Sequence, residues 1–187
     1  MTKSVLGIIG SPRRHGNTHV LVSRILDGAR EAGAAVETLF LADMAIRECD
    51  GCHACWQGKP CSKRDDMSGL FEQIARSDVL VFGTPVYWYG PTALMKAFLD
   101  RFVYFNCPDN RAKIKGHVAA LAIPFEDTDP ATAELLVKSF EKSLSYLEMN
   151  LAGCLLVPGV TRKGEIAEKA DRMKEAYALG AKLAAGR

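Results

Sequence analysis

The sequence predicts a doubly wound α/β fold in which helices cover both faces of a five-stranded parallel sheet with strand order 2-1-3-4-5. Two observations favour it: short apolar runs recur along the chain, and each is separated from the next by a segment long enough for a crossover helix. The 187 residues show no repeat or linker, so we expect a single domain over residues 1–187. In this fold, ligands bind beyond the carboxyl ends of the strands.

The apolar runs and the segments between them place each element in order. The first run, KSVLGIIG, ends on glycine and is typical of a strand buried on both faces. The expected strands cover residues 3–10, 36–41, 79–83, 118–123 and 154–157. The expected helices cover residues 18–32, 67–76, 92–105, 131–147 and 165–185. A cysteine-rich insert at about 47–64 lies between the second strand and the second helix.

Charge and hydropathy exclude several classes of partner. Lys and Arg number 24 and Asp and Glu number 22, so the net charge of +2 argues against a nucleic acid or a membrane surface as partner. No apolar run reaches the roughly 18 to 20 residues of a transmembrane helix, and the stretch SVLGIIGSP lacks the flanks of a signal peptide. We therefore expect a cytoplasmic protein, in which clustered cysteines are more often metal ligands or redox groups than structural disulfides.

The loop after the first strand, GSPRRHGNT, has the features of a phosphate site. Ser11, Asn17 and Thr18 offer donors immediately before a helix, where free N–H groups and the helix dipole attract anions. Arg13 or Arg14 can add charge. The loop lacks both the P-loop lysine and the G-x-G-x-x-G fingerprint. The alternative is an ordinary turn in which Thr18 caps the helix.

The loop after the third strand, TPVYWYGP, places three aromatic residues between prolines and a glycine. Tyr87, Trp88 and Tyr89 can form a wall for a flat ring, because aromatic faces stack and proline stiffens the loop. Alternatively, they pack in the core or at a subunit interface. In the expected strand order this loop lies beside the phosphate loop, and the two together suggest flavin mononucleotide (FMN).

These motifs resemble the NAD(P)H-dependent FMN reductases of the flavodoxin-like fold, and among them the iron-sulfur flavoproteins. The resemblance extends through GIIGSPRRHGNT, the cysteine cluster, SKRDDM and TPVYWYGPTALMKAFLDRF. It implies that the FMN phosphate is bound by Ser11, Arg13, Asn17 and Thr18. It implies that the isoalloxazine ring lies along Pro85, Val86, Tyr87, Trp88 and Gly90. The loop IPFEDTDP departs from the glycine-rich stretch often found after the fourth strand, which leaves its contact with the flavin open.

The cysteine spacing is Cys49-x2-Cys52-x2-Cys55-x5-Cys61. It resembles the compact motif of the iron-sulfur flavoproteins and suggests a [4Fe-4S] cluster, since soft, charged thiolates hold iron in tetrahedral sulfur coordination. Zinc is a second interpretation, although structural zinc sites more often divide their ligands into two separated pairs. A third leaves the four cysteines as free thiols or a disulfide. Cys107 and Cys154 lie outside the motif, and Cys154 is expected to be a small buried hydrophobe.

Five charged residues near these motifs are expected to be structural. Asp65 and Asp66 precede a helix, where carboxylates cap free N–H groups. Lys96 and Asp100 have the i, i+4 spacing of a surface ion pair, and Arg101 on the same predicted helix is assigned to helix placement or subunit contact.

Together the motifs predict an FMN-dependent oxidoreductase or electron-transfer flavoprotein that also carries a [4Fe-4S] cluster. The flavin carries the chemistry, so no catalytic side chain is assigned. One alternative is an FMN-only NAD(P)H-dependent reductase of quinones, flavins or other small acceptors. Another is a zinc-stabilised module that recognises a phosphate without turnover. The resemblance implies a small-molecule electron acceptor, NAD(P)H or a ferredoxin-type protein as donor, and a homodimer or homotetramer.

Overall fold

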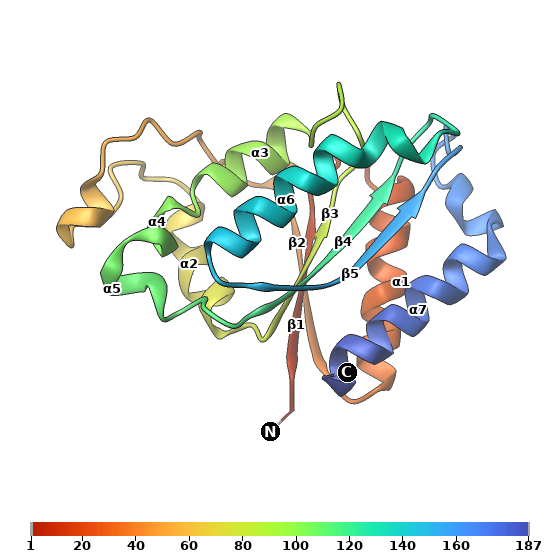
Figure 1. Ribbon diagram of the computed structural model, residues 1–187, viewed down its shortest axis with the longest axis horizontal. Coiled ribbons are helices and arrows are strands. Elements are labelled where there is room, and N and C mark those ends of the chain that lie inside the picture. The colour runs from red at the N-terminus through yellow and green to blue at the C-terminus, as the bar shows by residue number, and fades with distance from the viewer. Residues whose placement is uncertain (1, 187) are drawn as a thin grey trace.

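The computed structural model describes residues 2–186 and contains one five-stranded parallel sheet in the order β2-β1-β3-β4-β5 (Figure 1). This confirms the doubly wound, flavodoxin-like fold. Met1 and Arg187, the ends of the expected domain, lie outside the described residues. The strands are β1 (Ser4–Ile9), β2 (Ala35–Phe40), β3 (Val79–Gly83), β4 (Val118–Pro124) and β5 (Asn150–Val157).

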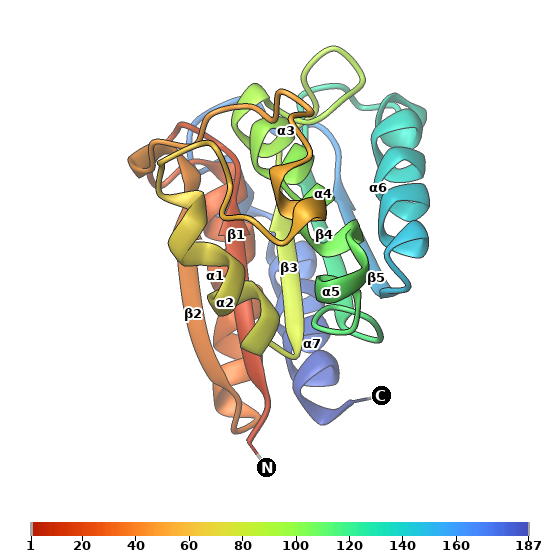
Figure 2. The same cartoon turned by 90° about the vertical axis from the view of Figure 1, so that its left-hand side faces the viewer.

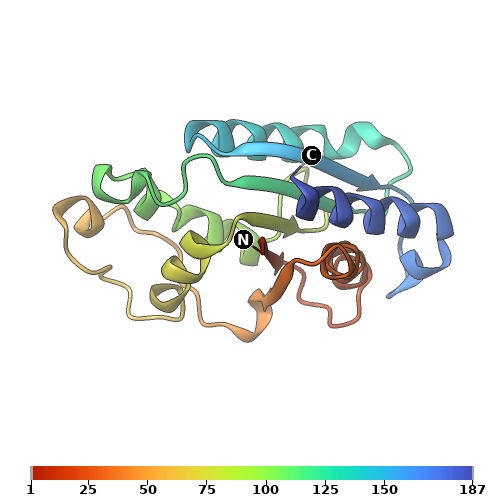
Figure 3. The ribbon, with the colours of Figure 1, turned by 90° about the horizontal axis from the view of Figure 1, so that it is seen from below.

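Helices cover both faces of the sheet (Figure 3). One layer contains α1 (Asn17–Glu31) and α7 (Ala170–Ala185). The other contains α2 (Met67–Arg76), α3 (Ala93–Asp100), α4 (Val103–Asn106), α5 (Pro108–Arg111) and α6 (Glu134–Tyr146). Short 3-10 helices cover Leu41–Asp43, Ala54–Gln57, Pro130–Ala133 and Glu165–Glu168. Within residues 2–186, no helix is both long enough and apolar enough to cross a membrane.

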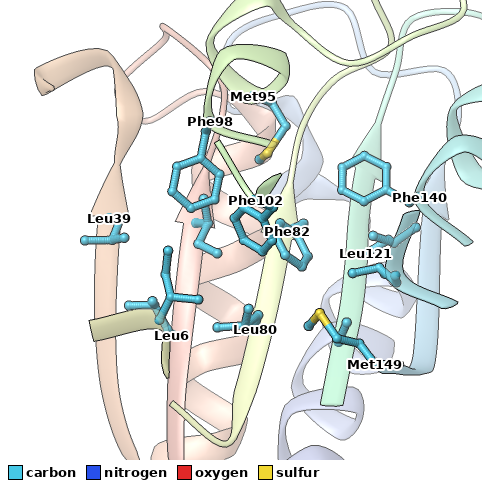
Figure 4. Packing of buried hydrophobic residues seen from close by; sticks show 14 of the residues in the cluster. Leu6, Leu39, Leu80, Phe82, Met95, Phe98, Phe102, Leu121, Phe140 and Met149 are labelled. Carbon is cyan, nitrogen blue, oxygen red and sulfur yellow. The ribbon is translucent and has the colours of Figure 1, made fainter. Parts of the chain in front are cut away.

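Each strand of the sheet's centre contributes side chains to both layers, as the continuous apolar runs predict. All five residues of β3 are buried, and alternate residues point to opposite faces. On the face under α3 and α6, the ring of Phe82 contacts those of Phe102 and Phe140 at centroid distances of 6.1 and 5.5 Å (Figure 4). This aromatic layer fixes the position of α3 and α4 on the sheet.

Four elements differ from the sequence prediction. The helices expected over 131–147 and 165–185 begin as the 3-10 helices Pro130–Ala133 and Glu165–Glu168 and continue as α6 and α7. The helix expected over 92–105 is divided into α3 and α4, because the N–H groups of Arg101 and Phe102 bond three residues back, to Phe98 and Leu99, which tightens the turn and ends α3. The last strand begins at Asn150 instead of 154, since pairing with β4 extends through small residues that carry no strand signal. Cys154 on this strand is exposed, so its expected burial was wrong.

Two glycines allow α1 and α7 to approach each other closely. A Cβ atom at Gly28 would lie 2.0 Å from the carbonyl oxygen of Tyr177, and one at Gly180 would lie 1.8 Å from that of Ile25. Backbone atoms cannot move aside as a flexible side chain can. The crossing therefore requires glycine at both positions, and it supports the helix whose first turn borders the site described below.

We predict that Gly28→Ala and Gly180→Ala each lower the free energy of unfolding by about 3 kcal/mol, the upper range for an overpacked interior. Gly69→Ala in α2 is the matched control, because a Cβ there meets nothing within 4 Å. The control should stabilise the protein by roughly 0.5–1 kcal/mol through helix propensity. Urea unfolding of the three variants tests this, and equal stabilities would contradict the close crossing.

Candidate functional site

The first cavity lies at the carboxyl ends of β1, β3, β4 and β5, where this fold binds its ligands. It brings together both loops that the sequence singled out. Its lining consists of Ser11, Arg13, Asn17, Thr18, Pro85, Val86, Tyr87, Pro124, Phe125, Glu126, Val160 and Thr161. Trp88 and Gly90 do not line this cavity. We call it the sheet-edge cavity.

The first turn of α1 presents free backbone donors to this cavity. The helix begins at Asn17, and its N-cap is Gly16, which has no side chain to satisfy the first N–H groups. Thr18 lies inside the helix and is buried, so the alternative in which Thr18 caps the helix was wrong. Uncapped N–H groups and the positive end of the helix dipole favour an anion at this position.

The two arginines of the loop have different surroundings. Arg14 forms an ion pair with Asp43, and its guanidinium lies 4.7 Å from the ring centroid of Phe40. Arg13 lines the sheet-edge cavity instead. Its backbone N–H bonds the hydroxyl of Ser11 at 3.3 Å, which holds both residues at the mouth of the cavity. Arg13 is therefore the cation available to a bound phosphate.

Asn17 fastens the loop after β5 to the phosphate loop. Its amide nitrogen donates to the carbonyl oxygens of Val160 and Arg162, at 3.4 and 3.0 Å. Its amide oxygen accepts from the N–H of Ile166 at 3.1 Å. The side chain is thus engaged with the protein itself, and what Asn17 can offer a phosphate is its backbone N–H.

The aromatic loop is a tight turn in which Tyr87 and Gly90 exchange backbone hydrogen bonds of 2.8 and 3.0 Å. Trp88 and Tyr89 occupy the turn with φ values of 49° and 61°, a left-handed conformation that is uncommon for aromatic residues. Trp88 is 96% exposed, so the alternative in which the aromatic residues pack in the core was wrong. It borders a shallow hollow beside the sheet-edge cavity, together with Glu126.

Two further loops border the cavity: the sequence left the contact of the loop after β4 with the flavin open, and it gave no signal for the loop after β5. Pro124, Phe125 and Glu126 follow β4, and Phe125 is held by a 3.0 Å hydrogen bond from its N–H to the carbonyl of Val157. Val160 and Thr161 follow β5. The signal that could have found them is topological, since every loop at the carboxyl edge of a parallel sheet is a candidate for the site.

The second cavity lies in the cysteine segment, which we define as residues 47–65. Figures 1 and 2 show this segment as a loop that projects beside α4. All four motif cysteines line the cavity, together with Asp50, Gly51, His53, Lys63, Arg101, Val103 and Tyr104. The ring of Tyr104 stacks on Phe71 of α2 at 4.0 Å, which ties the cavity to the core. We call it the cysteine cavity.

Polar contacts surround its sulfur atoms. Arg101 donates from Nη2 to the sulfur of Cys61 at 3.2 Å, and the sulfur of Cys52 lies 3.1 Å from the hydroxyl of Ser62. Burial raises the pKa of the Cys55 thiol. Among residues 2–186, no three His, Cys, Asp or Glu side chains are arranged to hold a metal ion. Within residues 2–186 the four cysteines line one cavity, but their side chains are not grouped around a single ion.

A buried ion pair closes the cysteine segment. The Arg101 and Asp65 side chains are 2% and 3% exposed, and Arg101 Nη1 lies 2.6 Å from Asp65 Oδ2. Asp65 Oδ2 also accepts from the backbone N–H of Arg47, while Arg101 donates to the carbonyl of Arg47. The expected helix capping was wrong for Asp66, which makes no side-chain cap and accepts from the N–H of Ala45. Both carboxylates are structural, as expected. The surface pair of Lys96 and Asp100 was confirmed at 2.5 Å.

Comparison with known proteins reveals related sequences. The family model described as NADPH-dependent FMN reductase matches residues 4–140. An iron-sulfur flavoprotein from Archaeoglobus fulgidus is 34% identical over 118 residues, which cover 63% of this chain and 54% of the relative. Another, from Methanocaldococcus jannaschii, is 37% identical over 97 residues, or 52% of this chain and 50% of the relative. The chain thus spans about half the length of these curated relatives.

Solved structures share the fold. The structure of an NAD(P)H:quinone oxidoreductase from Methanothermobacter marburgensis superposes with a TM-score of 0.76 over 98% of this chain and 96% of that one. The sequence identity is 19%, so this likeness concerns the fold alone.

We predict that Asp65→Asn lowers the free energy of unfolding by about 3–5 kcal/mol at neutral pH, because it leaves the buried Arg101 guanidinium without its counter-charge. Burial raises the pKa of Asp65, but hydrogen bonds from Arg101 and Arg47 lower it further than burial raises it. The ionised Asp65 carboxylate therefore contributes its full stabilisation above pH 3.8, the ordinary pKa of an aspartate. This stabilisation is lost as the pH falls through the lower pKa that Asp65 has in the folded protein.

Urea unfolding of wild type and variant between pH 7 and pH 3 measures this difference. The gap between the two proteins should narrow only below about pH 4. Asp66→Asn is the control, since Asp66 is exposed and faces no buried cation; it should change stability by less than about 1 kcal/mol. A gap that stays constant down to pH 3 would contradict the assignment.

Proposed function

Because the chain belongs to the NADPH-dependent FMN reductase family, we propose that it is an FMN-dependent oxidoreductase that also carries a [4Fe-4S] cluster and moves electrons between the two centres. The observation that carries the proposal is the pairing of two cavities. One gathers the phosphate and aromatic loops, and the other is lined by all four motif cysteines. The proposal of a cluster is also supported by the names of the similar iron-sulfur flavoproteins.

The sheet-edge cavity offers FMN donors for its phosphate and an apolar surface for its ring. Its phosphate end has the uncapped first turn of α1, the hydroxyl of Ser11 and the cation of Arg13. Its other end has Val86 and Tyr87, whose apolar surfaces suit a flat heterocycle. We assign the phosphate to the first group and the ring to the second. Trp88, in the adjoining hollow, is placed to border whatever molecule approaches the ring from solvent.

The cysteine cavity fits a cluster by the chemistry of its donors. Four cysteines without disulfide partners line it, and the guanidinium of Arg101 donates to one sulfur. A [4Fe-4S] cluster offers a separate iron to each cysteine, so its ligands surround a volume. Cys49, Cys52, Cys55 and Cys61 would hold it, with Val103 and Tyr104 as the apolar wall.

The chain contributes binding and orientation. Bound FMN exchanges electrons in pairs or singly, and a cluster exchanges them one at a time. The protein's part is to hold the phosphate on α1, to keep the aromatic loop beside the ring and to keep the sulfurs in place. No side chain is assigned as general acid or base.

We propose NAD(P)H or a ferredoxin-type protein as electron donor and a small molecule as acceptor, in a cytoplasmic homodimer or homotetramer. Trp88 and Tyr89 are exposed and held in a strained turn beside the sheet-edge cavity, and this supports the presence of a second subunit that covers them.

We predict that Arg13→Met weakens FMN binding about ten- to a hundredfold, the loss expected for one charged hydrogen bond of about 1.5–3 kcal/mol. Arg14→Met is the matched control, because Arg14 is paired with Asp43. It should change the affinity less than about threefold. Quenching of FMN fluorescence on titration with apoprotein measures both, and equal losses in the two variants would contradict the assignment of Arg13.

We predict that protein purified without oxygen contains FMN and about four iron and four sulfide per chain. Its visible spectrum should show a broad absorption beneath the flavin bands that bleaches on reduction. Cys61→Ala should lose the iron and keep FMN, whereas Cys154→Ala, outside the motif, should keep both. Flavin bands alone, with no iron and with rapid bleaching by NADH or NADPH, would replace the proposal with an FMN-only reductase.

A further inference from the structure

The guanidinium of Arg101 makes contacts that an ion pair for stability alone does not need. It uses one nitrogen for Asp65 and the carbonyl of Arg47, and directs the other to the sulfur of Cys61 at 3.2 Å. Arg47 lies at the beginning of the cysteine segment, Cys61 lies near its end, and Asp65 is its last residue. One side chain at the C-cap of α3 therefore connects both ends of the segment to one of its sulfurs.

The placement of this charge is energetically demanding. Arg101 is 2% exposed and remains charged, so its hydrogen bonds must be satisfied by protein groups. Asp65 neutralises the charge, and its second carboxylate oxygen is buried without a hydrogen-bond partner within the described part of the chain. Apolar residues at both positions together would avoid both demands. The arrangement indicates that a cation is needed beside Cys61.

We propose that Arg101 is a positioning residue of the cysteine cavity, which holds the cysteine segment closed and stabilises added negative charge on the sulfur ligands through its hydrogen bond to Cys61. The inference rests on the proposed function, because it concerns the metal centre that the four cysteines would bind. Reduction of that centre adds one electron and one negative charge. A cation that donates to a ligand sulfur stabilises the reduced form and raises the reduction potential.

The expected effect is a shift in the one-electron equilibrium. Removing the cation should favour the oxidised form about tenfold, which corresponds to a fall of about 59 mV in a one-electron potential. The double variant Asp65→Asn/Arg101→Gln removes both charges and leaves neutral amides that can bond each other, so it avoids an unpaired buried charge. Arg101→Lys keeps the cation and should keep the one-electron equilibrium constant within about threefold of wild type.

A second pair serves as the matched control. Arg111 and Glu148 form an ion pair between α5 and the end of α6, and neither lines the cysteine cavity. The double variant Arg111→Gln/Glu148→Gln should leave the potential unchanged. If the role of Arg101 is purely structural, the Asp65→Asn/Arg101→Gln variant is less stable than wild type, but the reduction potential of the metal centre that it still binds is unchanged.

The experiment measures iron and sulfide first, and then the reduction potential by anaerobic titration with dithionite, for wild type and all three variants. A fall in potential confined to the Asp65→Asn/Arg101→Gln variant supports the inference. So does loss of iron from that variant alone, with its far-UV circular dichroism unchanged and iron retained in Arg101→Lys. If the Asp65→Asn/Arg101→Gln variant retains its iron and its potential is unchanged, the role inferred for Arg101 is overturned and the proposed cluster is not. Wild-type protein without iron would overturn it together with the cluster itself.

Discussion

The ion pair between Arg101 and Asp65 determines where the cysteine segment lies. Two charged groups that are almost fully buried are stable only when each satisfies the other, so the pair fixes the relative position of the segments that carry them. Through Arg47, the same pair joins the beginning of the segment to its end. The long loop that carries the four cysteines thereby becomes a closed one, although it contains a single short 3-10 helix among its described elements.

Helix α3 connects this pair to the sheet-edge cavity. At its first end, the hydroxyl of Thr92 accepts from the N–H of Met95 and donates to the carbonyl of Gly10, the residue that begins the phosphate loop. At its other end, Arg101 contacts Cys61. The eight residues of α3 separate Thr92 from Arg101, so nine steps of about 1.5 Å place the two residues about 14 Å apart along the axis. The aromatic layer beneath α3 prevents this rod from shifting. One rigid element thus sets the distance between the two proposed cofactor sites within a chain.

The fold was predictable because its signal is local and repeated. Apolar runs and crossover lengths place every strand of the sheet, and the parallel order brings the loops after β1 and β3 to the same edge. The errors arose where tertiary contacts outweighed local pattern. The sequence around Asp65 and Asp66 has the composition of a helix cap, but a guanidinium 36 residues later competes for the carboxylate. A sequence pattern that covers a few residues cannot indicate a partner 36 residues away. The loop after β5 was missed, and the contact of the loop after β4 was left open, because neither loop carries a recognisable sequence motif.

The two cavities differ in how they are held ready for a ligand. The phosphate end of the sheet-edge cavity consists of backbone N–H groups on a helix of 15 residues, whose position is fixed by close packing against α7. Such a site exists before its ligand arrives. The cysteine cavity consists of loop residues, and a metal centre bound to thiolates normally supplies much of the free energy that folds such a loop. The buried pair changes this balance, because it removes conformational freedom from the segment before any ligand is bound. Closure by Arg101 and Asp65 and ligation by the four cysteines therefore favour the same conformation, and each makes the other more stable.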